Sequence, residues 1–204
     1  MRCGYNESIP AFLVLDGPDA SGTTTHCKLL AERLRSEGHD VVLTSEPTDG
    51  PTGKEIRDYL KTGNVDPMEL QMLFTKDREW HVENVITPAL AAGKTVISDR
   101  YWFSTIIYAE AQGLDSTKLK FLNMKFPEPD GVIFTLPPVE LSLSRIKKRA
   151  AKDFFEREEF QRKIHEGYAR MAEGSPLIHV IDTSGEKSEV AEKIWGIVKN
   201  CLSP

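Results

Sequence analysis

Short apolar runs alternate with amphipathic stretches along the whole chain. The apolar runs are rich in Val, Ile and Leu, which is typical of strands that are buried on both faces of a parallel sheet. Five such runs are expected as strands: 11–15, 41–44, 95–98, 132–136 and 177–181. Because helical patterns separate them, the chain is expected to form an α/β fold, with a mostly parallel sheet and helices on both faces.

The amphipathic stretches have the period of an α-helix. Cys27, Leu30, Ala31 and Leu34 fall at i, i+3, i+4 and i+7, and Gly38 is a plausible end for that helix. The same spacing recurs over 82–90 and over 190–201. We find no internal repeat, low-complexity tract or linker, so residues 1–204 are expected to form a single domain.

Composition excludes several kinds of protein. The formal net charge of −5 makes the chain a poor non-specific binder of nucleic acid polymers. Its three cysteines show neither metal-site nor disulfide spacing, so a reducing cytoplasm is the expected location. The apolar runs are far shorter than the ~20 residues that span a membrane, and neither a membrane span nor a secretory signal is expected from the sequence.

A phosphate-binding loop is expected directly after the first strand. The run LDGPDASGTTTHCKLL places four residues between Gly17 and Gly22. Backbone N–H groups of such a loop and of the helix that follows it bind anionic oxygens. Residues 17–25 are therefore the predicted ATP-binding loop: Gly17, Pro18, Asp19, Ala20, Ser21, Gly22, Thr23, Thr24 and Thr25.

One position departs from the usual loop pattern. Lysine normally follows the second glycine, and this chain has Thr23 there. Thr24 stands where a hydroxyl would contact Mg²⁺. The AAGKT run at 91–95 is no substitute, because Pro88 occupies its first glycine position and the run precedes a strand.

Further segments join the loop in a recognisable order. They are TSEPTDGPTGKEIRDYL, LFTKDREWHVENVITPAL, SDRYWFSTIIY and LSRIKKRAAKDFFER. Together they resemble the thymidylate kinase family of P-loop nucleoside-monophosphate kinases over nearly the whole chain. The resemblance implies a three-layer P-loop kinase fold with a five-stranded parallel sheet and a small lid. It also implies ATP-dependent phosphorylation of dTMP to dTDP with Mg²⁺, by a homodimer.

The resemblance assigns roles near the phosphates. Asp19 matches a carboxylate that helps to hold the acceptor's sugar and to arrange the site. Asp99 and Arg100 end the third strand, where open α/β sheets bind ligands. Arg100 can bridge phosphates bidentately, and Asp99 can hold Mg²⁺ through water. Arg57 matches an arginine that reaches the acceptor phosphate.

Other residues match positions that bind the nucleoside. Phe74 is expected to stack on thymine and Arg78 to donate to its O4 atom, a contact that would leave the amino group of cytosine unpaired. Ser104 and Tyr108 match positions lining the base and sugar, where a bulky ring would exclude a 2′-hydroxyl.

The turn of Glu46 and Pro47 matches a landmark of the family. The arginine that often precedes it is Ser45 here. The acceptor-phosphate cluster is therefore one charge short of the pattern.

A basic segment over 145–163 is expected to be the lid. It mixes basic and acidic side chains, which also suits a solvated helix face. Family members without a loop arginine usually carry a catalytic arginine in the lid, but the position that often holds it is Phe154 here. Arg149, Lys152 and Arg157 are the candidates, and the sequence does not choose among them.

Three functions stay open at this stage. The leading one is phosphorylation of dTMP. The second is phosphorylation of another nucleoside monophosphate or of a deoxynucleoside. The third is a degenerate member of the family that binds nucleotides without turning them over, and its support is Thr23.

Overall fold

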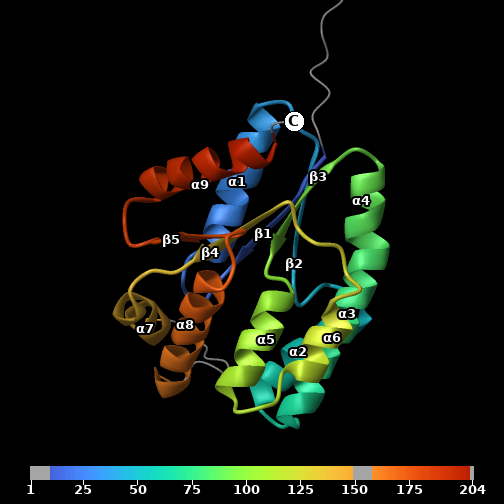
Figure 1. Cartoon of the computed structure of the whole chain (residues 1–204), viewed down its shortest axis with the longest axis vertical. Coiled ribbons are helices and arrows are strands. Elements are labelled where there is room, and N and C mark those ends of the chain that lie inside the picture. Colours follow the sequence, from blue (N-terminus) through green and yellow to red (C-terminus); the bar gives the residue numbers. More distant parts are fainter. Residues whose placement is uncertain (1–9, 149–157, 203–204) are drawn as a thin grey trace, which may run out of the picture.

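A five-stranded parallel sheet forms the centre of the molecule in the computed structural model, which describes residues 10–148 and 158–202 (Figure 1). The strand order is β2-β3-β1-β4-β5, and every neighbouring pair is parallel. The strands are β1 (Phe12–Asp16), β2 (Val41–Ser45), β3 (Thr95–Asp99), β4 (Gly131–Thr135) and β5 (Ile178–Ile181). The expected α/β class and all five predicted strands are confirmed, with ends that differ by one residue at most.

Helices connect the strands and cover both faces of the sheet (Figure 1). Their bounds are α1 (Thr23–Ser36), α2 (Pro51–Thr62), α3 (Pro67–His81), α4 (Thr87–Ala91), α5 (Trp102–Ala111), α6 (Thr117–Asn123), α7 (Val139–Lys147), α8 (Glu158–Glu173) and α9 (Lys187–Cys201). A π-helical turn, η1 (Val82–Ile86), joins α3 to α4. Among the described helices, none has the length and apolar character needed to cross a membrane.

Side chains along the strands alternate between two hydrophobic cores, one on each face of the sheet. Phe12 and Val14 of β1 point to a core that α2, α3, α5 and α8 complete. Leu13 and Leu15 point to the opposite face, where α1 and α9 pack. Successive side chains of a strand point to opposite faces, and both faces here are covered, which explains why the strands are apolar at nearly every position.

Glycines shape the turn between β1 and α1. Gly22 has a φ of +98°, a conformation that favours glycine. A Cβ atom on Gly17 would lie 2.4 Å from the Thr135 hydroxyl, so only glycine lets the loop pass this close to β4. The loop is therefore held at the carboxyl end of the sheet, with the N-terminus of α1 open beside it.

Candidate active site

Two adjoining hollows lie at the carboxyl ends of the central strands. The larger one, the phosphate cleft, has a volume of about 860 Å³ and is lined by residues 18–28 and the segment after β2. The smaller one, the base pocket, has a volume of about 170 Å³ and lies between that segment, α3 and α5. Asp19, Glu46 and Arg100 line both hollows, so a ligand in one would meet a ligand in the other at these residues.

Thr23 points into the protein. Its hydroxyl lies 3.0 Å from that of Ser21 and 2.9 Å from that of Thr135, and the latter two are 2.8 Å apart. Thr23 is 6% exposed. The side chain at the usual lysine position thus helps to fasten the loop to β4, and its backbone N–H at the start of α1 is the group left for a phosphate.

Thr24 and Asp99 come together, although 75 positions separate them. The Thr24 hydroxyl donates a hydrogen bond of 2.5 Å to the Asp99 carboxylate. Within the described residues, no group of three or more His, Cys, Asp or Glu side chains is placed to hold a metal ion. Mg²⁺ usually binds proteins through one or two carboxylates together with phosphates and waters, so this pair fits such an ion bound with a nucleotide.

Arg100 ties the phosphate loop to the start of α5. Its guanidinium donates to Asp19 Oδ1 at 2.8 Å, to the Gly17 carbonyl at 2.9 Å and to the Ser104 hydroxyl at 3.2 Å. The Tyr108 hydroxyl donates to the other oxygen of Asp19 at 3.0 Å. The structure thus brings together five residues that the sequence analysis singled out.

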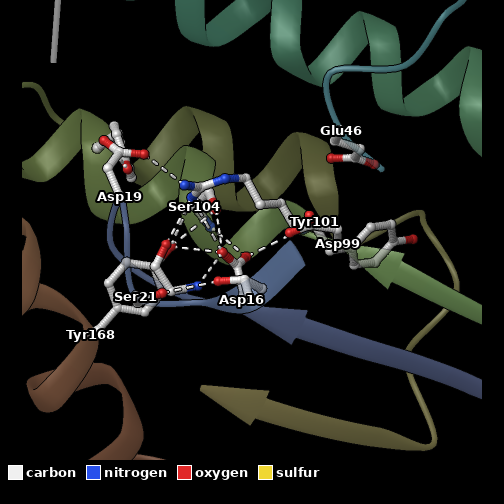
Figure 2. Close-up of polar contacts among 12 residues, drawn as sticks. Asp16, Asp19, Ser21, Glu46, Asp99, Tyr101, Ser104 and Tyr168 are labelled. Carbon is white, nitrogen blue, oxygen red and sulfur yellow. Dashed lines mark hydrogen bonds and ion pairs between the residues drawn. The ribbon is translucent and has the colours of Figure 1, made fainter. Parts of the chain in front are cut away.

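Asp16, the last residue of β1, holds this cluster in place. The sequence analysis did not predict it as a site residue. Its fully buried carboxylate accepts a hydrogen bond of 2.5 Å from Ser104 and one of 2.7 Å from the Tyr168 hydroxyl (Figure 2). Burial raises the pKa of Asp16, while the nearby Arg100 guanidinium opposes that rise. Tyr168 lies on α8, 152 positions away, so no local sequence signal could have paired it with Asp16.

The base pocket brings Phe74 and Arg78 to one wall, as their spacing on α3 predicts. Arg78 is 1% exposed and nearly all of its donors are used. Its Nε and Nη2 atoms donate to Glu46 Oε2, Nη2 also donates to Thr105, and Nη1 donates to Asn123. A guanidinium has five N–H groups, so one N–H on Nη1 has no hydrogen-bond partner in the part of the chain that the structure describes.

Two arginines flank the phosphate cleft in different ways. Arg57 donates to the Pro47 carbonyl at 2.8 Å and pairs with Asp49 at 2.6 Å. Arg145, which was not predicted, donates to the carbonyls of Ala20 and Thr183 at 3.2 and 3.1 Å. Arg145 therefore lies beside the phosphate loop. The predicted lid candidates Arg149, Lys152 and Arg157 lie outside the described residues.

The family follows from comparison with known proteins. The family model described as thymidylate kinase matches residues 15–194. The chain belongs to the thymidylate kinase family. A protein named probable thymidylate kinase from Thermococcus kodakarensis is 40% identical over 94% of this chain and 98% of its own length.

Relatives from other organisms agree with this assignment. A probable thymidylate kinase from Pyrococcus horikoshii is 39% identical over 94% of this chain and 97% of its own length. A thymidylate kinase from a Synechococcus strain is 37% identical over 92% of this chain and 94% of its own length. The resemblance inferred from the motifs is therefore confirmed, together with the three-layer P-loop kinase fold.

Proposed function

We propose that this member of the thymidylate kinase family binds dTMP in the base pocket and ATP on the phosphate loop. Its reaction is the ATP-dependent phosphorylation of dTMP to dTDP. The observation that carries the assignment of the two hollows is the position of Arg100, which lines both and donates to the phosphate loop. A guanidinium placed there suits a phosphoryl group passing from one ligand to the other.

The transfer moves the γ-phosphoryl group of ATP to a phosphate oxygen of dTMP and leaves ADP. Enzymes achieve this mainly by positioning and by stabilising charge. Arg100 would contact the transferring group, and Asp19 with Tyr108 would hold Arg100 in place. Mg²⁺, held through Thr24 and Asp99, would neutralise phosphate charge.

Acceptor choice would come from the walls of the base pocket. The spare N–H of Arg78 suits the O4 atom of thymine, and Phe74 would stack on the ring. Tyr108 would lie under the sugar, where its ring leaves no room for a 2′-hydroxyl. Arg57, on the cleft side, would reach the acceptor phosphate by releasing its exposed partner Asp49.

An acceptor panel tests this assignment. ADP release would be followed with ATP, Mg²⁺ and each of dTMP, dUMP, dCMP and UMP. We expect dTMP to be phosphorylated well, dUMP less well, and dCMP and UMP poorly. A higher kcat/KM for dCMP or UMP would overturn the thymine assignment, and nucleotide binding without any transfer would favour the degenerate alternative.

We further propose a cytoplasmic homodimer that closes a lid over ATP. Phe121 of α6 and Met124, which directly follows that helix, are 73% and 76% exposed, which suits an apolar contact with a second copy. Light scattering coupled to size exclusion would show a dimer mass, and a monomer at micromolar concentration would contradict this part. The lid would comprise residues 145–163, of which 149–157 lie outside the described part.

A further inference from the structure

Glu46 connects the base pocket to a histidine behind it. Its Oε2 atom accepts two hydrogen bonds from Arg78, at 3.0 and 2.5 Å. Its Oε1 atom lies 3.0 Å from Nδ1 of His81, which is fully buried. Glu46 lines the base pocket, whereas His81 does not. His81 would therefore influence a ligand in the base pocket through Glu46.

The hydrogen bonds of His81 fix its ring orientation. Nε2 lies 2.7 Å from the hydroxyl of Thr44 on β2. Because a carboxylate oxygen only accepts, Nδ1 must donate to Glu46. Nε2 faces the Thr44 hydroxyl, so both ring nitrogens have partners. His81 also ends α3 directly before the π-helical turn, an element that often occurs at functional sites.

Holding the Glu46 carboxylate matters for base choice. Thymine presents a keto oxygen at C4, which the spare Arg78 N–H can donate to, while cytosine presents an amino group there. Cytosine would need an acceptor at that place. The Glu46 carboxylate is a charged acceptor that lies beside Arg78 and lines the base pocket, and its Oε2 atom already receives two hydrogen bonds. Oε1 would have to turn toward the base, and the hydrogen bond from His81 opposes this turn.

We propose that His81 is a positioning residue for base selection, because it holds Glu46 Oε1 away from the base. The pocket then offers the C4 substituent of the base a hydrogen-bond donor and no acceptor, and this excludes cytosine. This inference rests on the proposed placement of dTMP in the base pocket. It requires no contact between His81 and the nucleotide.

The test compares kcat/KM for dTMP and dCMP in the full-length enzyme. His81→Leu fills much of the same volume without a donor, whereas His81→Asn retains an N–H near the position of Nδ1. We expect the preference for dTMP over dCMP to fall about tenfold in the leucine variant, through a gain with dCMP, and to recover largely in the asparagine variant. Thr75→Val is the control, because it removes a different buried polar group of α3, a hydroxyl that donates to the Gln71 carbonyl.

The outcomes separate the two proposals. A wild-type enzyme that does not prefer dTMP would refute the placement of thymine itself. A folded His81→Leu variant whose rates with dTMP and dCMP fall together would show a purely structural role and overturn the inference. Should that variant not fold, His81→Met removes the Nδ1 donor with a different apolar side chain. An unchanged preference in His81→Met would then overturn the inference, and a reduced preference would support it.

Discussion

Arg100 combines an unusual backbone with a dense set of contacts. Its φ is +75°, a conformation that costs an ordinary residue about 1 kcal/mol or more. The guanidinium nevertheless reaches Asp19, the Gly17 carbonyl and Ser104 from this position. A strained backbone at a residue shared by two hollows is consistent with a role in the chemistry.

Replacing Arg100 by alanine should lower kcat by about 10³-fold or more, because the charge at the transferring phosphoryl group would be lost. Arg100→Lys retains the charge but loses the planar guanidinium, so its kcat should lie between those of the wild type and the alanine variant. Rates and thermal unfolding would be measured together. A folded alanine variant with near-normal kcat would contradict the catalytic role, and an unfolded one would indicate that Arg100 mainly compensates Asp16 and Asp19.

Thr23→Val tests the buried hydroxyl cluster at the lysine position. The change preserves shape but removes the partner of Ser21 and Thr135, so the free energy of unfolding should fall by about 1–2 kcal/mol. Thr25→Val, on the exposed side of the same turn, should change it by less than about 0.5 kcal/mol. Urea denaturation checks both values. Equal effects of the two substitutions would mean that the cluster does not fasten the loop.

At the scale of elements, one carboxylate joins three helices. Glu110 at the end of α5 accepts hydrogen bonds from Ser116 at 2.7 Å and from Lys120 of α6 at 2.8 Å. Arg170 of α8 lies 3.5 Å from its other oxygen. Burial raises the pKa of Glu110, but the hydrogen bonds from Lys120 and Ser116 outweigh it and hold the pKa below its usual range. The ionised form therefore stabilises the fold.

Glu110→Gln should lower the free energy of unfolding by about 1 kcal/mol at neutral pH. Because the pKa is lower in the folded state, the unfolded state binds more protons in acid, and this stabilisation is lost as the pH falls below about 4.5. The variant and the wild type should then converge once the pH lies below the lowered pKa of Glu110. Glu173→Gln, an exposed change of the same charge on α8, serves as the control. A difference that stays constant with pH would contradict the assignment.

At the scale of the whole molecule, the phosphate loop lacks the lysine charge of the usual pattern. A unit charge at ~4 Å and an effective dielectric constant of about 20 contributes roughly 4 kcal/mol. The Thr23 hydroxyl cannot supply it. We propose that Arg149, Lys152 or Arg157 brings this charge to the β- and γ-phosphates when the lid closes.

Changing each of these three residues to glutamine should yield at least one variant with kcat lowered by about two to three decades and with ADP affinity nearly intact. Arg145→Gln provides the comparison, because Arg145 already contacts the Ala20 carbonyl and its loss should weaken ADP binding as well. Single-turnover rates and calorimetric titration with ADP would separate the two behaviours. Normal kcat in all three lid variants would exclude the lid as the source.

Local patterns in the sequence determined the elements. The apolar runs gave all five strands to within one residue, because strands buried on both faces need apolar side chains at nearly every position. The spacing of Phe74 and Arg78 placed them on one face of α3, and that spacing depends only on the helical repeat. The glycines after β1 likewise predicted the phosphate loop, since few other residues allow its backbone.

Tertiary structure decided which groups meet and which donors remain free. The order of the strands and the packing of α8 bring Tyr168 to Asp16, across 152 positions of chain. The inward direction of Thr23 and the near-complete use of the Arg78 donors depend on Thr135 and Asn123, which belong to other elements. Helical and strand periods report only which face a side chain lies on. Its partner across the core is set by how distant elements pack, and no local repeat in the sequence encodes that.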